Sequence, residues 1–207
     1  MEPNAAAEHL QVIRTLMERS ALYRRTLAPV MLYLGTVGTL AGLGGILIGI
    51  EALPLFYGWW FAAAGLALTG AFLIARRQAV GEGEPFWSPP AVRVAQAMAP
   101  PLAAGVVLGL ALLLFEAAPP RGLFVLANAL FYGCAVHAAG TFMPRGMKRF
   151  GWMVIVVSAA GSAGLAVLEP AVAGPRLAHA VMGCVFGVLH LAYGAYLYAT
   201  ERRETDA

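Results

Sequence analysis

The chain has 207 residues, of which 60% are hydrophobic and 12% are charged. This composition excludes an ordinary soluble domain, in which roughly 25% of the residues carry a charge. The net charge of +3 is small, and the basic residues lie at the ends of apolar segments, which does not suit a nucleic-acid-binding surface. We therefore expect a protein whose solvent is the lipid bilayer and which has no nucleic-acid partner.

Six apolar segments have the length that a membrane crossing requires, which is about 17 to 25 residues. They are Ala28–Ile50, Leu53–Ala75, Met98–Phe115, Gly122–Met143, Gly151–Leu168 and Leu177–Thr200. Prolines, which cannot continue a helix, lie at predicted helix ends, namely Pro29, Pro100, Pro101, Pro144, Pro170 and Pro175. The sequence therefore predicts an all-α fold with a six-helix transmembrane domain over residues 27–200.

The distribution of Lys and Arg predicts the orientation of these helices. On one side of the six-span arrangement lie Arg14, Arg19, Arg24, Arg25, Arg76, Arg77, Arg93, Arg145, Lys148, Arg149, Arg202 and Arg203. Only Arg121 and Arg176 lie on the other side. Because basic connections stay in the cytoplasm, we predict three helical hairpins in a bacterial cytoplasmic (inner) membrane. Both termini, including the tail 201–207, are then cytoplasmic.

The segment 1–26, which precedes the first crossing, has the pattern of an amphipathic helix. Its apolar side carries Leu10, Ile13 and Leu16, and its polar side carries Arg14 and Glu18. A basic amphipathic helix suits the surface of an anionic inner leaflet. A cytoplasmic helix packed on loops or on a second subunit fits the same pattern.

Two histidines inside predicted spans are candidate site residues, because ionisable groups are costly in a membrane. His137 lies in the fourth span and His190 in the sixth, at similar depths that permit the rings to meet. Facing imidazoles could ligate haem b, bind a quinone head group or relay protons. Alternatively, each ring hydrogen-bonds a neighbouring group, such as the hydroxyl of Thr141 for His137, and no cofactor is bound.

Small residues in the last span predict a packing surface. At steps of 100° per residue, one stripe of the helix carries Arg176, His179, Gly183, Gly187, His190 and Gly194. Other spans carry glycines four residues apart, in the pairs Gly38 and Gly42, Gly45 and Gly49, and Gly105 and Gly109. Such spacing lets helix backbones approach closely. The two cysteines, Cys134 and Cys184, lie within apolar runs and are predicted to be small buried residues.

Two further patterns carry less weight. Glu51, Glu116 and Glu169 each follow the first helix of a predicted hairpin. A ring of carboxylates there could attract cations, but solvated turn residues are the favoured interpretation. The run Gly161-Ser162-Ala163-Gly164 superficially resembles the serine motif of rhomboid proteases, but the serine is second rather than third. We therefore interpret Ser162 as a packing residue.

Four stretches together carry a resemblance that covers nearly the whole chain. They are His9–Arg25, Glu84–Pro90, His137–Gly140 leading into Met143–Gly146, and Gly187–Gly194. With these stretches the chain resembles a family of uncharacterised bacterial integral membrane proteins. The resemblance implies a six-span membrane protein and implies no activity, cofactor or partner.

The leading hypothesis from the sequence is a non-enzymatic accessory or sensory component of the inner membrane. Its partners would be the lipid bilayer and either another membrane protein or further copies of the chain. One alternative is a haem- or quinone-binding redox subunit that uses His137 and His190. A second alternative is a small transporter, which requires a polar cavity between helices.

Overall fold

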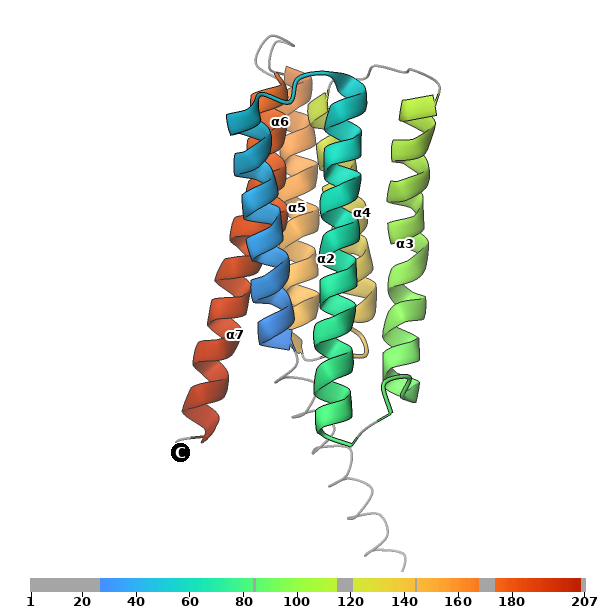
Figure 1. The fold of residues 1–207 in the computed structure, drawn as a ribbon, viewed down its shortest axis with the longest axis vertical. Coiled ribbons are helices and arrows are strands. Elements are labelled where there is room, and N and C mark those ends of the chain that lie inside the picture. Colours follow the sequence, from blue (N-terminus) through green and yellow to red (C-terminus); the bar gives the residue numbers. More distant parts are fainter. Residues whose placement is uncertain (1–26, 84, 115–120, 144, 168–173, 206–207) are drawn as a thin grey trace, which may run out of the picture.

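The computed structural model describes residues 27–83, 85–114, 121–143, 145–167 and 174–205 (Figure 1). Within these residues the chain is all-helical. The helices are Leu27–Ile48, called the first helix below, followed by α2 (Leu53–Gly81), α3 (Pro89–Leu114), α4 (Arg121–Ala139), α5 (Arg145–Val167), α6 (Pro175–Met182), η2 (Gly183–Val188) and α7 (Leu189–Thr205). The last three continue one another and form a single rod, called the last helix below. The predicted amphipathic helix of 1–26 lies outside the described residues.

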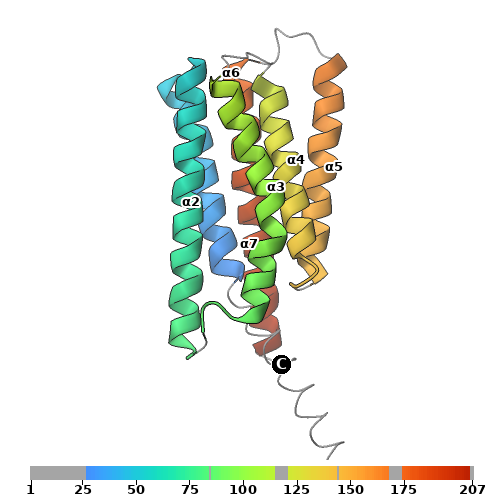
Figure 2. The ribbon, with the colours of Figure 1, turned by 90° about the vertical axis from the view of Figure 1, so that its right-hand side faces the viewer.

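The helices lie side by side along one common direction (Figures 1 and 2). Helix α4 makes its most extensive contacts with α5 and then with α3, whereas α2 and α3 contact each other little. The first helix lies between α2 and the last helix in Figure 1. The beginning of the first helix and the end of α7 lie at the same end of the bundle, the lower end in Figure 1.

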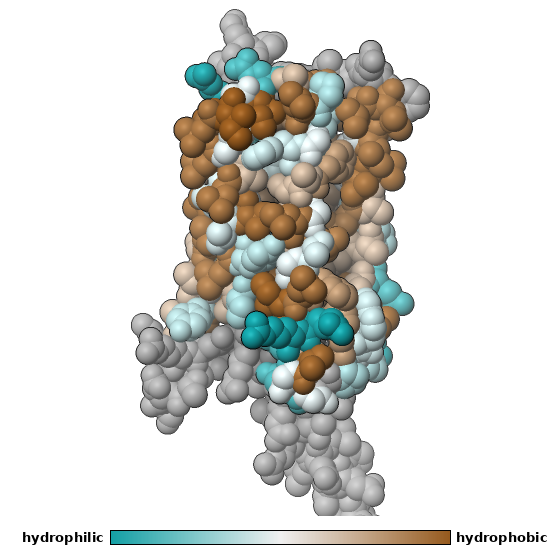
Figure 3. Space-filling model, viewed as in Figure 1, coloured by the Kyte–Doolittle hydropathy of each residue, from teal (hydrophilic) through white to brown (hydrophobic). Residues whose placement is uncertain are grey.

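Five of the described helices are long and apolar enough to cross a membrane, which makes the chain a multi-pass membrane protein. Helix α5 is not one of the five, and its first turns carry Lys148 and Arg149. Large aliphatic side chains point outward, with Leu47 84% exposed and Val107 64% exposed. Figure 3 shows the resulting apolar surface over most of the bundle's height. An outward-facing apolar surface of this kind is expected where lipid replaces water.

Local sequence explains how the first two helices meet at the upper end of the bundle. Gly49 has a φ of 74°, a left-handed conformation that Gly adopts without a Cβ penalty. The backbone N–H of Ile50 then bonds to the carbonyl of Gly45 at 3.0 Å, which closes the first helix. Helix α2 starts only a few residues later with Pro54 in its first turn, where a missing N–H costs nothing. The tight connection places the carbonyl of Ile50 over the end of the bundle.

The prediction that Pro100 and Pro101 mark a helix start was wrong, because both lie inside α3. That helix begins at Pro89, so the preference of proline for the first turn of a helix is met at this earlier position instead. Helix α2 likewise continues past Ala75 to Gly81, and α5 begins at Arg145 rather than Gly151. The helices extend beyond the apolar segments because their polar end turns can reach the head groups. Inside the bundle, neighbouring helices and local adjustments compensate for carbonyls that proline leaves without a donor.

The first helix and the last helix pack against each other along glycines, a surface called the glycine interface below. It consists of Gly35, Gly38, Gly42 and Gly45 on the first helix and Gly183, Gly187 and Gly194 on the last helix. A Cβ added to Gly42 would lie 2.7 Å from the Cα of Gly183, and one added to Gly194 would lie 2.9 Å from the backbone nitrogen of Leu32. The two backbones are therefore in direct contact. This confirms the packing surface predicted for the last span.

The other predicted glycine pairs behave differently from one another. Gly105 and Gly109 of α3 face Asn128 and Phe124 of α4, with Cβ positions that would lie 2.9 and 3.3 Å from those side chains. They therefore act as packing residues, as predicted. Gly49 ends a helix and has no heavy atom within 4 Å of its Cβ position, so its role is conformational.

Candidate functional site

His137, the first predicted site residue, lies in the last turn of α4 and is half-buried. Its Nδ1 lies 3.4 Å from the carbonyl oxygen of Lys148 on α5, at the long limit of a hydrogen bond. The ring contacts the edge of Trp152, with 5.2 Å between ring centroids. Thr141, the partner suggested by the sequence, lies in the turn beyond the helix and is exposed. His137 thus occupies the edge of the bundle.

His190, the second predicted site residue, is 1% exposed and makes two hydrogen bonds. Its Nδ1 lies 3.0 Å from the carbonyl oxygen of Val185, and its Nε2 lies 2.6 Å from the hydroxyl of Tyr132 on α4. A carbonyl can only accept, so Nδ1 carries a proton; in the neutral imidazole the Tyr132 hydroxyl then donates to Nε2. Both ring nitrogens are therefore in use.

A π-helical turn provides the carbonyl that His190 uses. Element η2 spans Gly183–Val188, and the N–H of Leu189 bonds to the carbonyl of Cys184, five residues back. Such a turn widens the helix and changes which carbonyls remain available to side chains. The turn also belongs to the glycine interface through Gly183 and Gly187. The same turn therefore contacts the first helix and binds the His190 ring.

The structure does not bring His137 and His190 together. The aromatic rings around His190 are Tyr132, Phe150 and Phe186, at centroid distances of 5.2, 5.1 and 6.4 Å. His137 instead contacts Trp152 and Lys148. Within the described residues the two imidazoles share no hydrogen bond and no ring contact. A bis-histidine haem needs one free nitrogen from each ring at the same iron, and His190 offers none in this arrangement.

His179 is a further buried histidine that links three parts of the bundle, and the sequence placed it only on a packing stripe. It is 1% exposed. Its Nε2 lies 3.1 Å from the carbonyl oxygen of Ile50, and its Nδ1 lies 3.1 Å from the indole nitrogen of Trp60 on α2. The ring packs on Phe56 at 4.7 Å between centroids. Nε2–H therefore donates to Ile50, and Nδ1 accepts from the Trp60 N–H.

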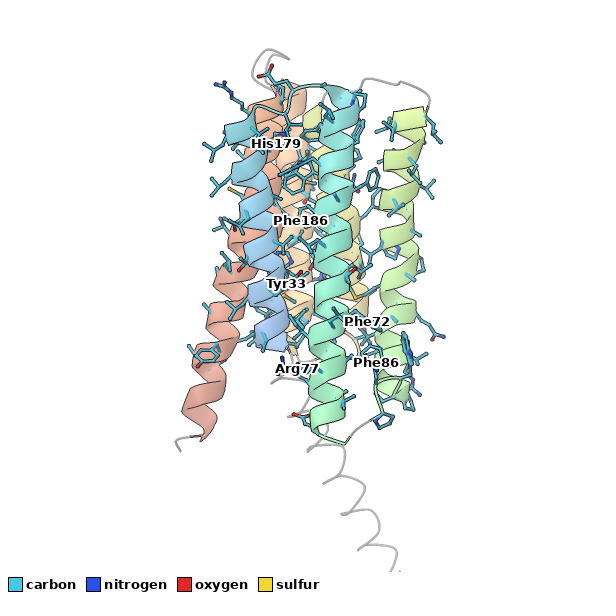
Figure 4. All side chains as sticks on the ribbon, viewed as in Figure 1. Tyr33, Phe72, Arg77, Phe86, His179 and Phe186 are labelled. Atoms are coloured by element: carbon cyan, nitrogen blue, oxygen red, sulfur yellow. The ribbon has the colours of Figure 1, made fainter. Side chains whose placement is uncertain are left out.

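The glycine interface also shapes the surroundings of His179. A Cβ on Gly45 would collide with the imidazole ring, so the absence of a side chain there leaves the space that the ring fills. Figure 4 shows His179 at the upper end of the bundle and Phe186 further down the same helix. The spacing of glycines in the sequence indicated this close approach. The partner Trp60, 119 residues away in the chain, could not be inferred from spacing.

Other candidate groups of the sequence play ordinary structural roles. Ser162 donates its hydroxyl to the carbonyl of Ser158 at 2.9 Å, one turn back in its own helix, which fits a packing residue. Cys184 is exposed on the surface of the helix bundle rather than buried as predicted, and Cys134 is half-buried. Glu51 is exposed, whereas Glu116 and Glu169 lie outside the described residues. Among the described residues, no group of three or more His, Cys, Asp or Glu side chains could hold a metal ion.

Comparisons with family models, with curated proteins and with solved structures give no match for this chain. The arrangement of the helices and the two buried histidines are therefore the features that bear on function.

Proposed function

We propose that this protein is a non-enzymatic accessory or sensory component of a bacterial inner membrane. It crosses the membrane six times, as three hairpins, with both termini in the cytoplasm. The observation that carries the proposal is the glycine interface. Along this interface the first helix and the last helix are in contact over much of their length. The hydrogen bonds of His179 and His190 fix the last helix at two further points.

The six-span topology is supported by the geometry of α5. This helix has 23 residues, which corresponds to a length of about 35 Å at 1.5 Å per residue. A hydrocarbon core is about 30 Å thick. Helix α5 also runs alongside α4, which is itself apolar enough to cross a membrane. The polar residues Lys148 and Arg149 lie in its first turns, where they would reach the head groups.

The orientation is supported by charge. Arg76, Arg77, Arg93 and Arg149 are exposed at the end where α2 stops and where α3 and α5 start. Basic residues gather on the cytoplasmic side of membrane proteins. We expect a cysteine placed at Ala52 to react with an impermeant thiol reagent added outside the cells, and one placed at Gly83 to react only after lysis. The reverse labelling pattern would overturn the orientation.

The accessory role is supported by how the buried polar groups are used. Both nitrogens of His190 and both nitrogens of His179 are engaged in hydrogen bonds within the bundle. Groups engaged in this way hold helices in register and are not free to bind a ligand. The polar side chains that would otherwise suggest chemistry therefore stabilise the arrangement of the first helix, α2, α4 and the last helix.

The continuity of the last helix supports a sensory role. His179 contacts the carbonyl of Ile50 at one end of the bundle, and the same rod continues through η2 and α7 to the other end. A displacement of the first helix at the upper end would therefore move the last helix along the glycine interface. The π-helical turn is the segment of the last helix with non-α hydrogen bonding, so it is where such a movement could be absorbed.

Proximity labelling in the source bacterium tests the accessory role, with the labelling enzyme fused to the C-terminus. We expect the wild-type chain to label a small and reproducible set of membrane proteins. The variant Gly42→Leu, which disrupts the glycine interface, should lose this set. The variant Gly65→Leu should keep it, because the Cβ position of Gly65 has no neighbour within 4 Å. Labelling indistinguishable from that of an unrelated six-span protein would contradict the proposal.

The redox alternative requires a rearrangement around His190. A haem b iron or a quinone oxygen could use Nε2 only after the Tyr132 hydroxyl has moved away from it, because the two atoms are 2.6 Å apart. The π-helical turn beside His190 is the feature that favours this alternative, since such turns are frequent at functional sites. His137 would not be the second ligand in the arrangement described here.

A further inference from the structure

The lower end of α2 carries a hollow that combines two positive charges with apolar walls. Its volume is about 400 Å³, and the described residues that line it are Leu73, Arg76, Arg77 and Val80. These positions, at spacings of three and four residues, lie on one face of the helix. Leu73 is 54% exposed and Val80 is 65% exposed, so aliphatic side chains flank the two guanidinium groups on either side.

Aromatic side chains indicate where the membrane interface lies along α2. Phe72 packs on Phe86, with 4.8 Å between ring centroids, and Phe86 packs on Trp87 at 5.0 Å. Trp87 is 63% exposed. Exposed Trp in a membrane protein is enriched at the level of the lipid head groups. Figure 4 shows Phe72, Phe86 and Arg77 near the same end of the bundle. These aromatic side chains are those expected at the level of the lipid head groups, and the arginine pair lies near them at the same end of α2.

The charge of this region favours an anion. Within the described part of the chain, neither Arg76 nor Arg77 takes part in a salt bridge, and Arg93 adds a further exposed positive charge at the same end of the bundle. Glu82 is an exposed acidic residue beyond the end of α2. Figure 3 shows a hydrophilic patch in the lower part of this face of the bundle, with largely apolar surface above it. The hollow thus places two positively charged side chains, Arg76 and Arg77, next to exposed aliphatic side chains.

We infer that this hollow is a binding site for an anionic phospholipid. The phosphodiester of the lipid lies between Arg76 and Arg77, whose guanidinium groups form paired, charge-assisted hydrogen bonds with phosphate oxygens. One acyl chain lies along Leu73 toward the middle of the membrane. Basic pockets on the cytoplasmic side of membrane proteins recognise anionic lipids in this way. The site holds a lipid rather than a free anion, because aliphatic side chains, Leu73 and Val80, are among the described residues that line it.

Native mass spectrometry of the delipidated protein tests this site, with phosphatidylglycerol and phosphatidylcholine as the two probes. We expect tighter binding of phosphatidylglycerol, and we expect the double variant Arg76→Gln and Arg77→Gln to weaken it roughly tenfold. The matched control is Lys148→Gln with Arg149→Gln, which removes the same charge from exposed positions at the start of α5. This control should leave phosphatidylglycerol binding within about twofold of wild type.

Three outcomes would overturn the inference. An equal loss of binding in the two double variants would show a diffuse electrostatic effect. No loss in either variant would place the lipid elsewhere. Displacement of the lipid by millimolar inorganic phosphate would show a site for a free anion. Far-UV circular dichroism of each variant checks that the exposed substitutions leave the helices intact, so that a loss of binding reports on the site.

Discussion

The substitution Gly42→Leu is expected to separate the first helix from the last helix. The Cβ of any residue at position 42 would lie 2.7 Å from the Cα of Gly183 and 3.1 Å from the carbonyl oxygen of His179. Both are backbone atoms, so the clash is relieved only if a whole helix moves. Overpacking of a close-packed interior costs about 1–3 kcal/mol. We expect a loss of at least this size in the free energy of unfolding.

Unfolding in mixed micelles with increasing dodecyl sulfate, followed by circular dichroism, measures the effect of Gly42→Leu. The matched control is Gly65→Leu on α2, a membrane helix glycine with no neighbour within 4 Å of its Cβ position. Gly65→Leu removes a glycine and adds the same side chain at a lipid-facing position, and we expect it to be neutral or slightly stabilising. If both variants unfold at the same dodecyl sulfate concentration, the two backbones are not in contact at Gly42.

The second large effect is expected for His179→Leu. This change leaves the carbonyl of Ile50 and the indole N–H of Trp60 without their present partner. A buried group that loses its hydrogen-bond partner costs about 1–3 kcal/mol. Leucine is close enough in size to limit the additional effect of a cavity. We therefore expect the stability loss to come mainly from the unpaired polar groups.

Two companion variants separate this explanation from a general packing effect. His179→Gln keeps one donor and one acceptor and should recover part of the stability. Trp60→Phe combined with His179→Leu should cost less than the sum of the single changes, because residues that share a hydrogen bond are not additive. The control His137→Leu should change the free energy of unfolding by about 0.5 kcal/mol or less, since His137 is half-buried with one long hydrogen bond. Strict additivity of Trp60 and His179 would contradict the proposed pair.

Much of the fold could be predicted because membrane helices are constrained by the bilayer. Each predicted apolar segment overlaps one described helix or rod, and the glycine spacing on the last span predicted the contact that Gly183 and Gly187 make. The helix ends were less predictable. Pro100 and Pro101 do not mark the start of α3, because the helix already begins at Pro89. The surrounding bundle accommodates the two later prolines.

The candidate site could be predicted only in part. His190 is buried, as its position in an apolar span suggested, but its partner Tyr132 lies 58 residues away in the chain. Which side chains meet across helices depends on how the helices rotate and cross, and periodicity within one helix does not determine that. The sequence does not indicate the π-helical turn, because Gly183–Val188 fits the pattern of an ordinary α-helix. For the same reason the similar depths of His137 and His190 permit a contact in the sequence, whereas the structure gives the two rings different neighbours.

Hydrogen bonds from His190 and His179 to Tyr132, Val185, Trp60 and Ile50 occupy both nitrogens of each ring. An absorption spectrum of the purified protein, oxidised and then reduced, after expression in a haem-sufficient bacterial host, tests whether these rings serve the bundle alone. We expect a spectrum with only the protein band, identical in wild type and His190→Ala. A reduced haem band that is present in wild type and lost in His190→Ala would contradict a purely structural role of His190 and establish a redox subunit.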